Sequence, residues 1–222
     1  YKTYLESTGK GGLEIARAAE SVTKETGTCI VVAPQFVDIK PIAERFDVPV
    51  FAQHVDGAEP GAFTGHILAE AVKNAGASGV MINHSERRLR LSEVDEANKR
   101  ARGIGLVSAI CANTATVAEA AASLHPDMVA IEPPELIGTG VAVSKAKPEI
   151  VSDTVLRIKR VNAEVYVLCG AGVTRAEDVE AAIRLGASGV LLATGVVKAK
   201  DVRLALLEMA QQAAKAHDHV RA

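Results

Sequence analysis

One six-residue pattern occurs twice at the same kind of position, and this repeat limits the folds that the chain can adopt. AGASGV occupies residues 75–80, and LGASGV occupies residues 185–190, which is 110 residues further along. Each copy stands where an Ala-rich helical stretch gives way to a short apolar run, and three other strand-like runs lie between the copies. Four units in 110 residues give about 27 to 28 residues each, so the 222 residues hold about eight units. This alternation predicts an α/β chain with a single (β/α)8 barrel over residues 1–222.

Seven β-branched, apolar runs predict the strands of this barrel: 28–34, 48–53, 79–83, 106–111, 128–131, 165–169 and 189–193. Helical stretches separate them, and Thr174 with Glu177 three residues later predicts the start of one helix. The eighth strand falls at residues 1–4, which lack an apolar run. We therefore expect the first strand to be truncated in this sequence. The alternative is an open seam, which would leave inner strand edges unpaired, and we favour truncation.

Charge and cysteine content exclude several classes of partner. Lys and Arg number 25 against 27 Asp and Glu, so no overall field favours nucleic acid or an anionic membrane. An odd number of widely separated cysteines (Cys29, Cys111 and Cys169) argues against a disulfide framework or a clustered metal site. No apolar run reaches the roughly 18 residues of a membrane span, and the start has no apolar signal core. We expect a cytoplasmic protein without a metal.

Reactive side chains follow several of the predicted strands. In a parallel barrel the carboxyl ends of all strands meet at one rim, so Lys2, His84 and Glu132 are expected to converge. A carboxylate can remove a C–H proton beside a carbonyl, while a neutral imidazole stabilises the enediolate that forms. The turns GAG at 170–172 and ATG at 193–195 offer backbone N–H groups to a phosphate. A lone histidine or glycine turn is a weak signal, so the prediction depends on their convergence.

The segment IEPPELIGTG at 131–140 combines stiff and free backbone. Pro133 and Pro134 follow Glu132 directly, whereas Gly138 and Gly140 loosen the other end. The strand starts at 128 and 165 are 37 residues apart, against 22 between those at 106 and 128, and the surplus falls at this segment. The pattern predicts a rigid lid that swings from a glycine hinge and closes on a ligand.

These features resemble the triosephosphate isomerase family, and most closely its short archaeal form, over essentially all 222 residues. The stretches that carry the resemblance are KTY (2–4), VVAPQ (31–35), FAQHVD (51–56), GAFTGH (61–66), NHSERR (83–88), IEPPELIGTG (131–140), AVSKAKPE (142–149) and LCGAGV (168–173). The resemblance implies a TIM barrel that interconverts dihydroxyacetone phosphate and D-glyceraldehyde 3-phosphate in glycolysis and gluconeogenesis. It implies no metal and no organic cofactor.

The resemblance also implies a role for each site residue. Glu132 is expected to be the base, His84 the neutral electrophile, and Lys2 the cation that binds substrate. Glu86 is placed to pair with Lys2 in support. The phosphate is expected to bind at Ile137, Gly138, Gly172, Ala193 and Thr194.

Thr64 resembles a loop tip that enters the site of a neighbouring subunit, which implies self-association as a homotetramer or a dimer. The sequence departs from the longer forms at Asn83, which replaces a glycine, and at Glu135, which replaces an aromatic residue. Two alternatives stay open. One is another phosphate-binding barrel enzyme acting on a larger sugar or indole phosphate, and the other is an inactive phosphate-binding scaffold.

Overall fold

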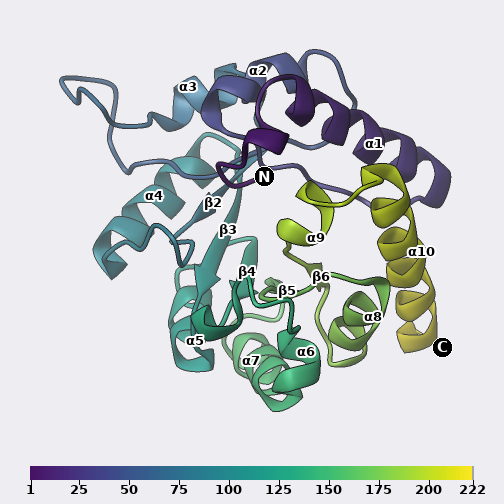
Figure 1. The fold of residues 1–222 in the computed structure, drawn as a ribbon. Helices are drawn as coiled ribbons and strands as arrows, with labels where there is room; N and C mark the ends of the chain where they lie inside the picture. Colours follow the sequence, from purple (N-terminus) through teal and green to yellow (C-terminus); the bar gives the residue numbers. More distant parts are fainter. Residues whose placement is uncertain (222) are drawn as a thin grey trace.

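A parallel β-sheet lies at the centre of the molecule, which we describe for residues 1–221 from a computed structural model (Figure 1). Its six strands follow one another in chain order, and each pairs with the next in parallel. They are β1 (Phe51–Ala52), β2 (Gly79–Ile82), β3 (Val107–Ala112), β4 (Met128–Ile131), β5 (Tyr166–Cys169) and β6 (Gly189–Val190). Neighbouring strands that are also consecutive in the chain are what a curled βα sheet requires.

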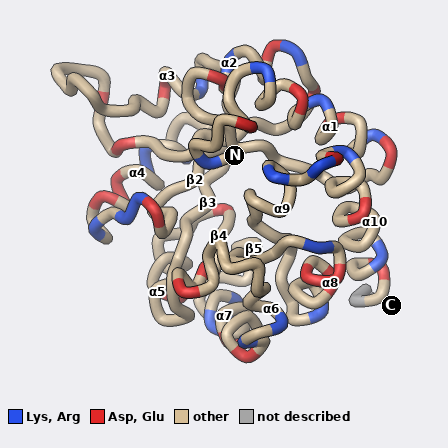
Figure 2. Tube along the Cα trace, in the orientation of Figure 1, with Lys and Arg blue, Asp and Glu red and all other residues tan. Residues whose placement is uncertain are grey.

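Helices surround the sheet, as Figure 1 shows. They are α1 (Lys10–Thr26), α2 (Phe36–Ala43), α3 (Ala69–Asn74), α4 (Leu91–Gly103), α5 (Ala115–Ala122), α6 (Val143–Ala146), α7 (Pro148–Val161), α8 (Ala176–Arg184), α9 (Thr194–Val197) and α10 (Val202–Arg221). Two short 3-10 turns, η1 (Leu5–Ser7) and η2 (Pro134–Leu136), complete the set. Lys, Arg, Asp and Glu mix over these outer elements, and the central strands carry few of them (Figure 2). Among the described residues, none of the helices has the length and apolar character needed to cross a membrane.

Branched aliphatic side chains fill the space between the sheet and the helices. Ile82, Ile110 and Val129 are completely or almost completely buried on β2, β3 and β4. Helices cover the outer face of these strands, so both faces lie away from water and the strands read as continuous apolar runs. This core holds the carboxyl ends of β2, β3 and β4 in fixed register.

The sheet is shorter at its two ends than the sequence predicts. The expected strand at 28–34 forms only a single bridge, from Val32 to Val50, and β6 contains two residues of the expected five. Residues 1–4 form no strand. A cavity of about 1880 Å³ extends from the rim between residues 28–32 and 188–192. Each of these two segments has a partner on one side only, which explains why the ladders stop early.

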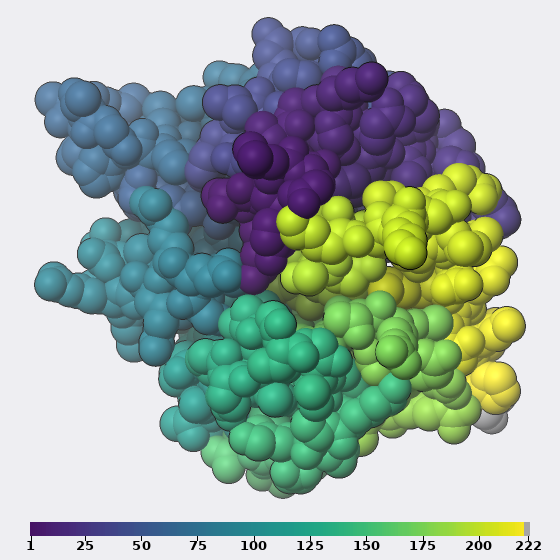
Figure 3. Space-filling model, in the orientation of Figure 1, coloured from purple at the N-terminus to yellow at the C-terminus, as the bar shows by residue number. Residues whose placement is uncertain are grey.

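The first and last units nevertheless lie side by side. In Figure 3 the purple start of the chain adjoins the yellow-green residues that follow β6. The hydroxyl groups of Tyr4 and Thr194 are 3.4 Å apart, and Lys198 pairs with Glu6. The first and last helical segments are therefore neighbours, and the helices form a ring around the sheet.

An extended arm, residues 57–66, projects between β1 and α3 (Figure 1). Its base is closed by Asp56, whose backbone N–H donates to the carbonyl of Ile67 (2.9 Å) and whose side chain accepts from the N–H of Ile67 (2.6 Å). His54 lies 3.2 Å from the same carboxylate. The arm thus leaves the body of the protein from a fixed position.

Candidate active site

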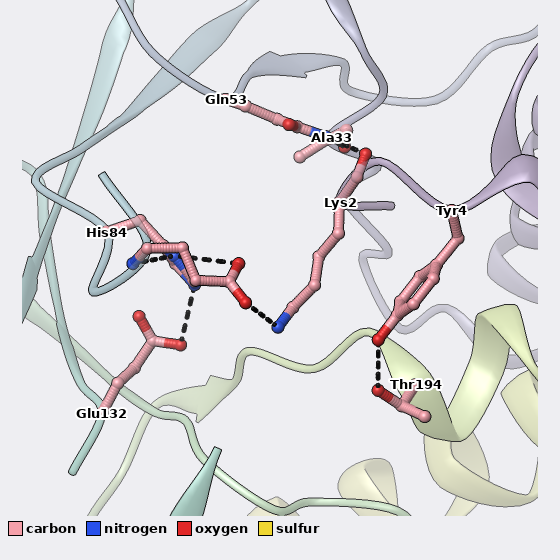
Figure 4. Close-up of polar contacts among 8 residues, drawn as sticks. Lys2, Tyr4, Ala33, Gln53, His84, Glu132 and Thr194 are labelled. Carbon is pink, nitrogen blue, oxygen red and sulfur yellow. Dashed lines mark hydrogen bonds and ion pairs between the residues drawn. The ribbon is translucent and has the colours of Figure 1, made fainter. Parts of the chain in front are cut away.

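The carboxyl ends of the strands bring together three side chains that are far apart in the sequence (Figure 4). His84 follows β2 and Glu132 follows β4, and Nε2 of His84 lies 3.4 Å from Oε1 of Glu132. Lys2 approaches from the start of the chain, and its Nζ donates to Oε1 of Glu86 at 2.7 Å. All the predicted site residues line one cavity, including Ile137, Gly138, Gly172, Ala193 and Thr194.

Glu132 is a buried carboxylate with one oxygen that is unpaired within residues 1–221. The residue is only 4% exposed, and its Oε2 has no hydrogen-bond partner among the described residues. A buried carboxylate oxygen without a partner is costly, so its presence at the rim fits a functional role better than a structural one. Burial raises the pKa of the Cys111 thiol far above its usual value, and the adjacent Glu132 raises it further. Cys111 therefore stays a neutral thiol beside this carboxylate.

His84 is held in place by the loop that follows β2. Its Nδ1 accepts from the backbone N–H of Glu86 at 3.2 Å, so in this geometry the ring proton lies on Nε2 and faces Glu132. Burial lowers the pKa of His84, but the hydrogen bond and charge of Glu132, followed by the charge of Glu86, outweigh burial and raise it. These surroundings therefore favour protonation of His84 more than water does, although the backbone contact at Nδ1 suits the neutral ring.

Asn83 positions this loop. Its backbone is left-handed, with φ at 64°, a conformation that asparagine tolerates better than most residues. The side-chain Nδ2 donates to the carbonyl of Cys111 at 3.0 Å, and Oδ1 accepts from the N–H of Leu89 at 2.8 Å. The asparagine thus joins the start of the loop to β3 and to the end of the loop at Leu89.

Lys2 is fixed through its backbone. Gln53 donates from Nε2 to the carbonyl of Lys2 at 3.0 Å and to the carbonyl of Ala33 at 2.9 Å. The sequence placed Gln53 at a strand end but gave no sign of this contact, because the two residues meet only in the folded chain. The lysine side chain is then free to reach across the rim to Glu86.

Residues 141–145 directly follow the lid segment 131–140, and this stretch, which we call the far end of the lid, packs on the first glycine turn. The N–H of Val143 donates to the carbonyl of Ala171 at 3.2 Å, and a Cβ on Gly172 would collide with the carbonyl oxygen of Val141. Gly172 also has a left-handed backbone, with φ at 71°. A glycine is therefore required there on two counts.

The predicted start of the helix at Thr174 with Glu177 is wrong. Helix α8 begins at Ala176, and the carboxylate that accepts from the N–H groups of Thr174 and Arg175 belongs to Asp178. Glu177 is exposed, whereas Asp178 is 4% exposed. Sequence reasoning missed Asp178 because adjacent acidic residues in a first turn give the same signal.

A parallel sheet in chain order, surrounded by helices and with a carboxylate, an imidazole and an ammonium group at its rim, is the arrangement of a (β/α)8-barrel enzyme. A model of the triosephosphate isomerase family matches residues 1–213, and the chain belongs to this family and is an isomerase.

Three archaeal relatives, each named triosephosphate isomerase, support that assignment. The protein of Methanocaldococcus jannaschii is 54% identical over 94% of this chain and 95% of its own length. That of Methanobacterium bryantii is 53% identical over 94% and 92%, and that of Methanosarcina acetivorans is 52% identical over 94% of both chains.

Proposed function

We propose that this isomerase interconverts dihydroxyacetone phosphate and D-glyceraldehyde 3-phosphate. The observation that carries the proposal is the 3.4 Å separation of His84 Nε2 from Glu132 Oε1 at the rim. A three-carbon substrate brings a C–H bond and the neighbouring carbonyl oxygen within reach of both groups. Family membership supports the same substrate.

Glu132 takes a proton from C1 of dihydroxyacetone phosphate, and the electron pair of that C–H bond forms the enediolate. The same carboxyl group returns the proton to C2, and proton shifts between the two oxygens complete the aldehyde, so no oxidant or reductant is needed. His84 donates from Nε2 to the oxygen that gains charge. A substrate between His84 and Glu132 separates them, which removes the largest influence that raises the pKa of His84. The ring then acts in its neutral form.

Lys2 supplies the positive charge of the site. Its side chain is 22% exposed and its ammonium group is paired with Glu86, so the charge is held at the rim before substrate arrives. An anionic substrate and the enediolate both gain from a cation at this position. Glu86 therefore supports Lys2 and does not react.

The phosphate occupies the space between the two glycine turns and the lid. Gly172, Ala193 and Thr194 line one side of the cavity, and Ile137 and Gly138 line the side that closes. Gly138 and Gly140 have left-handed backbones, which suits a hinge at the glycine end of the lid. Closure excludes water, so the intermediate does not lose its phosphate.

The whole chain acts as one cytoplasmic (β/α)8 domain and assembles into a homotetramer, or into a dimer. The arm at 57–66 supports this part of the proposal because it presents the half-exposed ring of Phe63 next to Thr64 on a rigid base. Light scattering on the purified protein tests the assembly, and a monomer at micromolar concentration would contradict it.

The activity is tested by measuring the interconversion in both directions with the purified protein, with Glu132→Gln as the inactive control. In D2O, the product aldehyde should carry deuterium at C2, because the proton passes through an exchangeable carboxyl group. Absence of turnover above the control would contradict the proposal. Turnover of a larger sugar phosphate alone would favour a different barrel enzyme.

A further inference from the structure

Asp178, on the first turn of α8, is a buried carboxylate outside the reacting groups. Its Oδ2 accepts from the backbone N–H of Thr174 at 3.0 Å and of Arg175 at 3.1 Å, with the Thr174 hydroxyl at 3.4 Å. These contacts hold the chain directly after the glycine turn 170–172. Thr174 also packs against the second turn, because a Cβ on Gly195 would lie 2.8 Å from its Cα. One carboxylate oxygen therefore fixes the residue at which both glycine turns meet.

The other oxygen of Asp178 faces the far end of the lid. Nζ of Lys145, on α6, lies 2.7 Å from Oδ1. The neighbouring Ser144 donates from Oγ to the backbone carbonyl of Asp178 at 3.2 Å. Helices α6 and α8 lie next to each other at the lower edge of Figure 1. Asp178 therefore contacts both the far end of the lid and the residues that follow the glycine turn 170–172.

A role as a helix cap alone does not account for this arrangement. Capping needs only the two backbone contacts, which Oδ2 provides by itself. Burial tends to raise the pKa of Asp178, but hydrogen bonds from Lys145, Thr174 and Arg175 outweigh burial and lower it. The group is therefore charged at neutral pH, and the first of these partners, Lys145, lies in the far end of the lid.

We propose that Asp178 is a positioning residue that joins the far end of the lid to the phosphate-binding turns through Lys145. The inference rests on the proposed function and adds to it the residue that couples lid position to phosphate binding. With the ion pair in place, residues 141–145 stay docked on the turn 170–172, and only the glycine end of the lid moves. Without it, the lid is fixed only at its proline end when the phosphate arrives.

Lys145→Met is the sharpest test, because Lys145 is half exposed and its loss leaves the cap of α8 intact. Lys145→Arg restores the charge. Arg184→Met is the matched control, because it removes an ion pair of 2.6 Å with Glu180 on the same helix, away from the site. Asp178→Asn removes the charge from the other partner, and if this variant fails to fold, Lys145→Met carries the test.

The substrates are D-glyceraldehyde 3-phosphate and D-glyceraldehyde, which lacks the phosphate. For Lys145→Met, KM for the phosphorylated substrate should rise roughly three- to thirtyfold, while kcat/KM for D-glyceraldehyde stays within about twofold. Release of inorganic phosphate per turnover should increase. Lys145→Arg should recover most of the loss, and Arg184→Met should match the wild type. An equal loss with both substrates, or no loss, overturns the inference.

Binding of inorganic phosphate, measured by calorimetry, separates this inference from the proposed function. If the wild type fails to interconvert the triose phosphates, the proposed function fails, but Lys145→Met should still bind phosphate more weakly than Arg184→Met. If the wild type is active and both variants bind phosphate equally, the coupling through Asp178 is wrong and the function stands.

Discussion

Gly170 and Glu132 are in contact across the ends of β5 and β4. A Cβ atom on Gly170 would lie 2.6 Å from Cγ of Glu132 and 3.0 Å from Oε1. Because Gly170 has no side chain, the carboxylate of Glu132 can occupy this space beside His84. The position of the proposed base therefore depends on a residue that itself has no reactive group.

Gly170→Ala is expected to push the carboxylate away from the substrate carbon. A displacement of about 1 Å should lower kcat about a hundredfold with a smaller change in KM. Gly103→Ala is the control, because no atom lies within 4 Å of a Cβ there. The measurement is steady-state kinetics on folded protein. If both variants keep wild-type kcat, the contact does not position the base.

Glu132→Asp shortens the side chain by one methylene group. We expect kcat to fall by about two orders of magnitude or more, because the shorter arm holds the carboxylate too far from the C–H bond. Phosphate affinity and thermal midpoint should change little. Glu164→Asp, at an exposed position before β5, is the control. A loss of folding equal to the loss of rate would show a structural carboxylate instead.

Asn83 is tested by a pair of substitutions. Asn83→Gly keeps the left-handed backbone but loses the contacts to Cys111 and Leu89, so we expect about 1 to 3 kcal/mol less stability and a lower kcat. Asn83→Ala should be less stable still, by about 1 kcal/mol, because alanine is strained at a φ of 64°. Urea unfolding measures both. Equal stability of the two variants would show that backbone strain at position 83 does not contribute to the loss.

The acid limb of the pH profile reports His84. The proposed mechanism needs the neutral ring, so kcat/KM should fall as pH drops through the pKa of His84 in the free enzyme. Glu86 raises that pKa and Lys2 lowers it. Glu86→Gln removes the former and frees Lys2 from its partner, so the acid limb should move to lower pH. An unchanged limb, or a shift to higher pH, would assign it to another group.

The strand-end residues were predictable from the sequence because parallel strands deliver their carboxyl ends to one rim. His84, Glu132 and Lys2 needed only the order of the strands, and the structure brings them to one cavity. The family and the α/β barrel class were also predicted correctly. The barrel class has local signals, namely strand runs, helix periods and glycine turns, whereas the family was predicted from the resemblance of motifs such as NHSERR (83–88) and IEPPELIGTG (131–140).

Contacts made by the folded chain were not predictable. The shared amide of Gln53, the contact of Gly170 with Glu132 and the burial of Asp178 depend on which segments meet. The strand lengths at 28–34 and 189–193 were overestimated, because β-branched composition does not reveal whether a neighbouring strand is there to pair. Gln53, Gly170 and Asp178 position the groups of the site, and no pattern in the sequence indicates these contacts.

Gln53 holds the carbonyl oxygens of Lys2 and Ala33 with a single nitrogen atom. The backbone of Lys2, which carries the ammonium group of the site, is therefore anchored by a side chain on the segment after β1. A substitution of Gln53, for example by the shorter Asn, therefore offers a way to alter how strongly this protein binds negatively charged molecules. Such a change leaves every side chain that faces the ligand as it is.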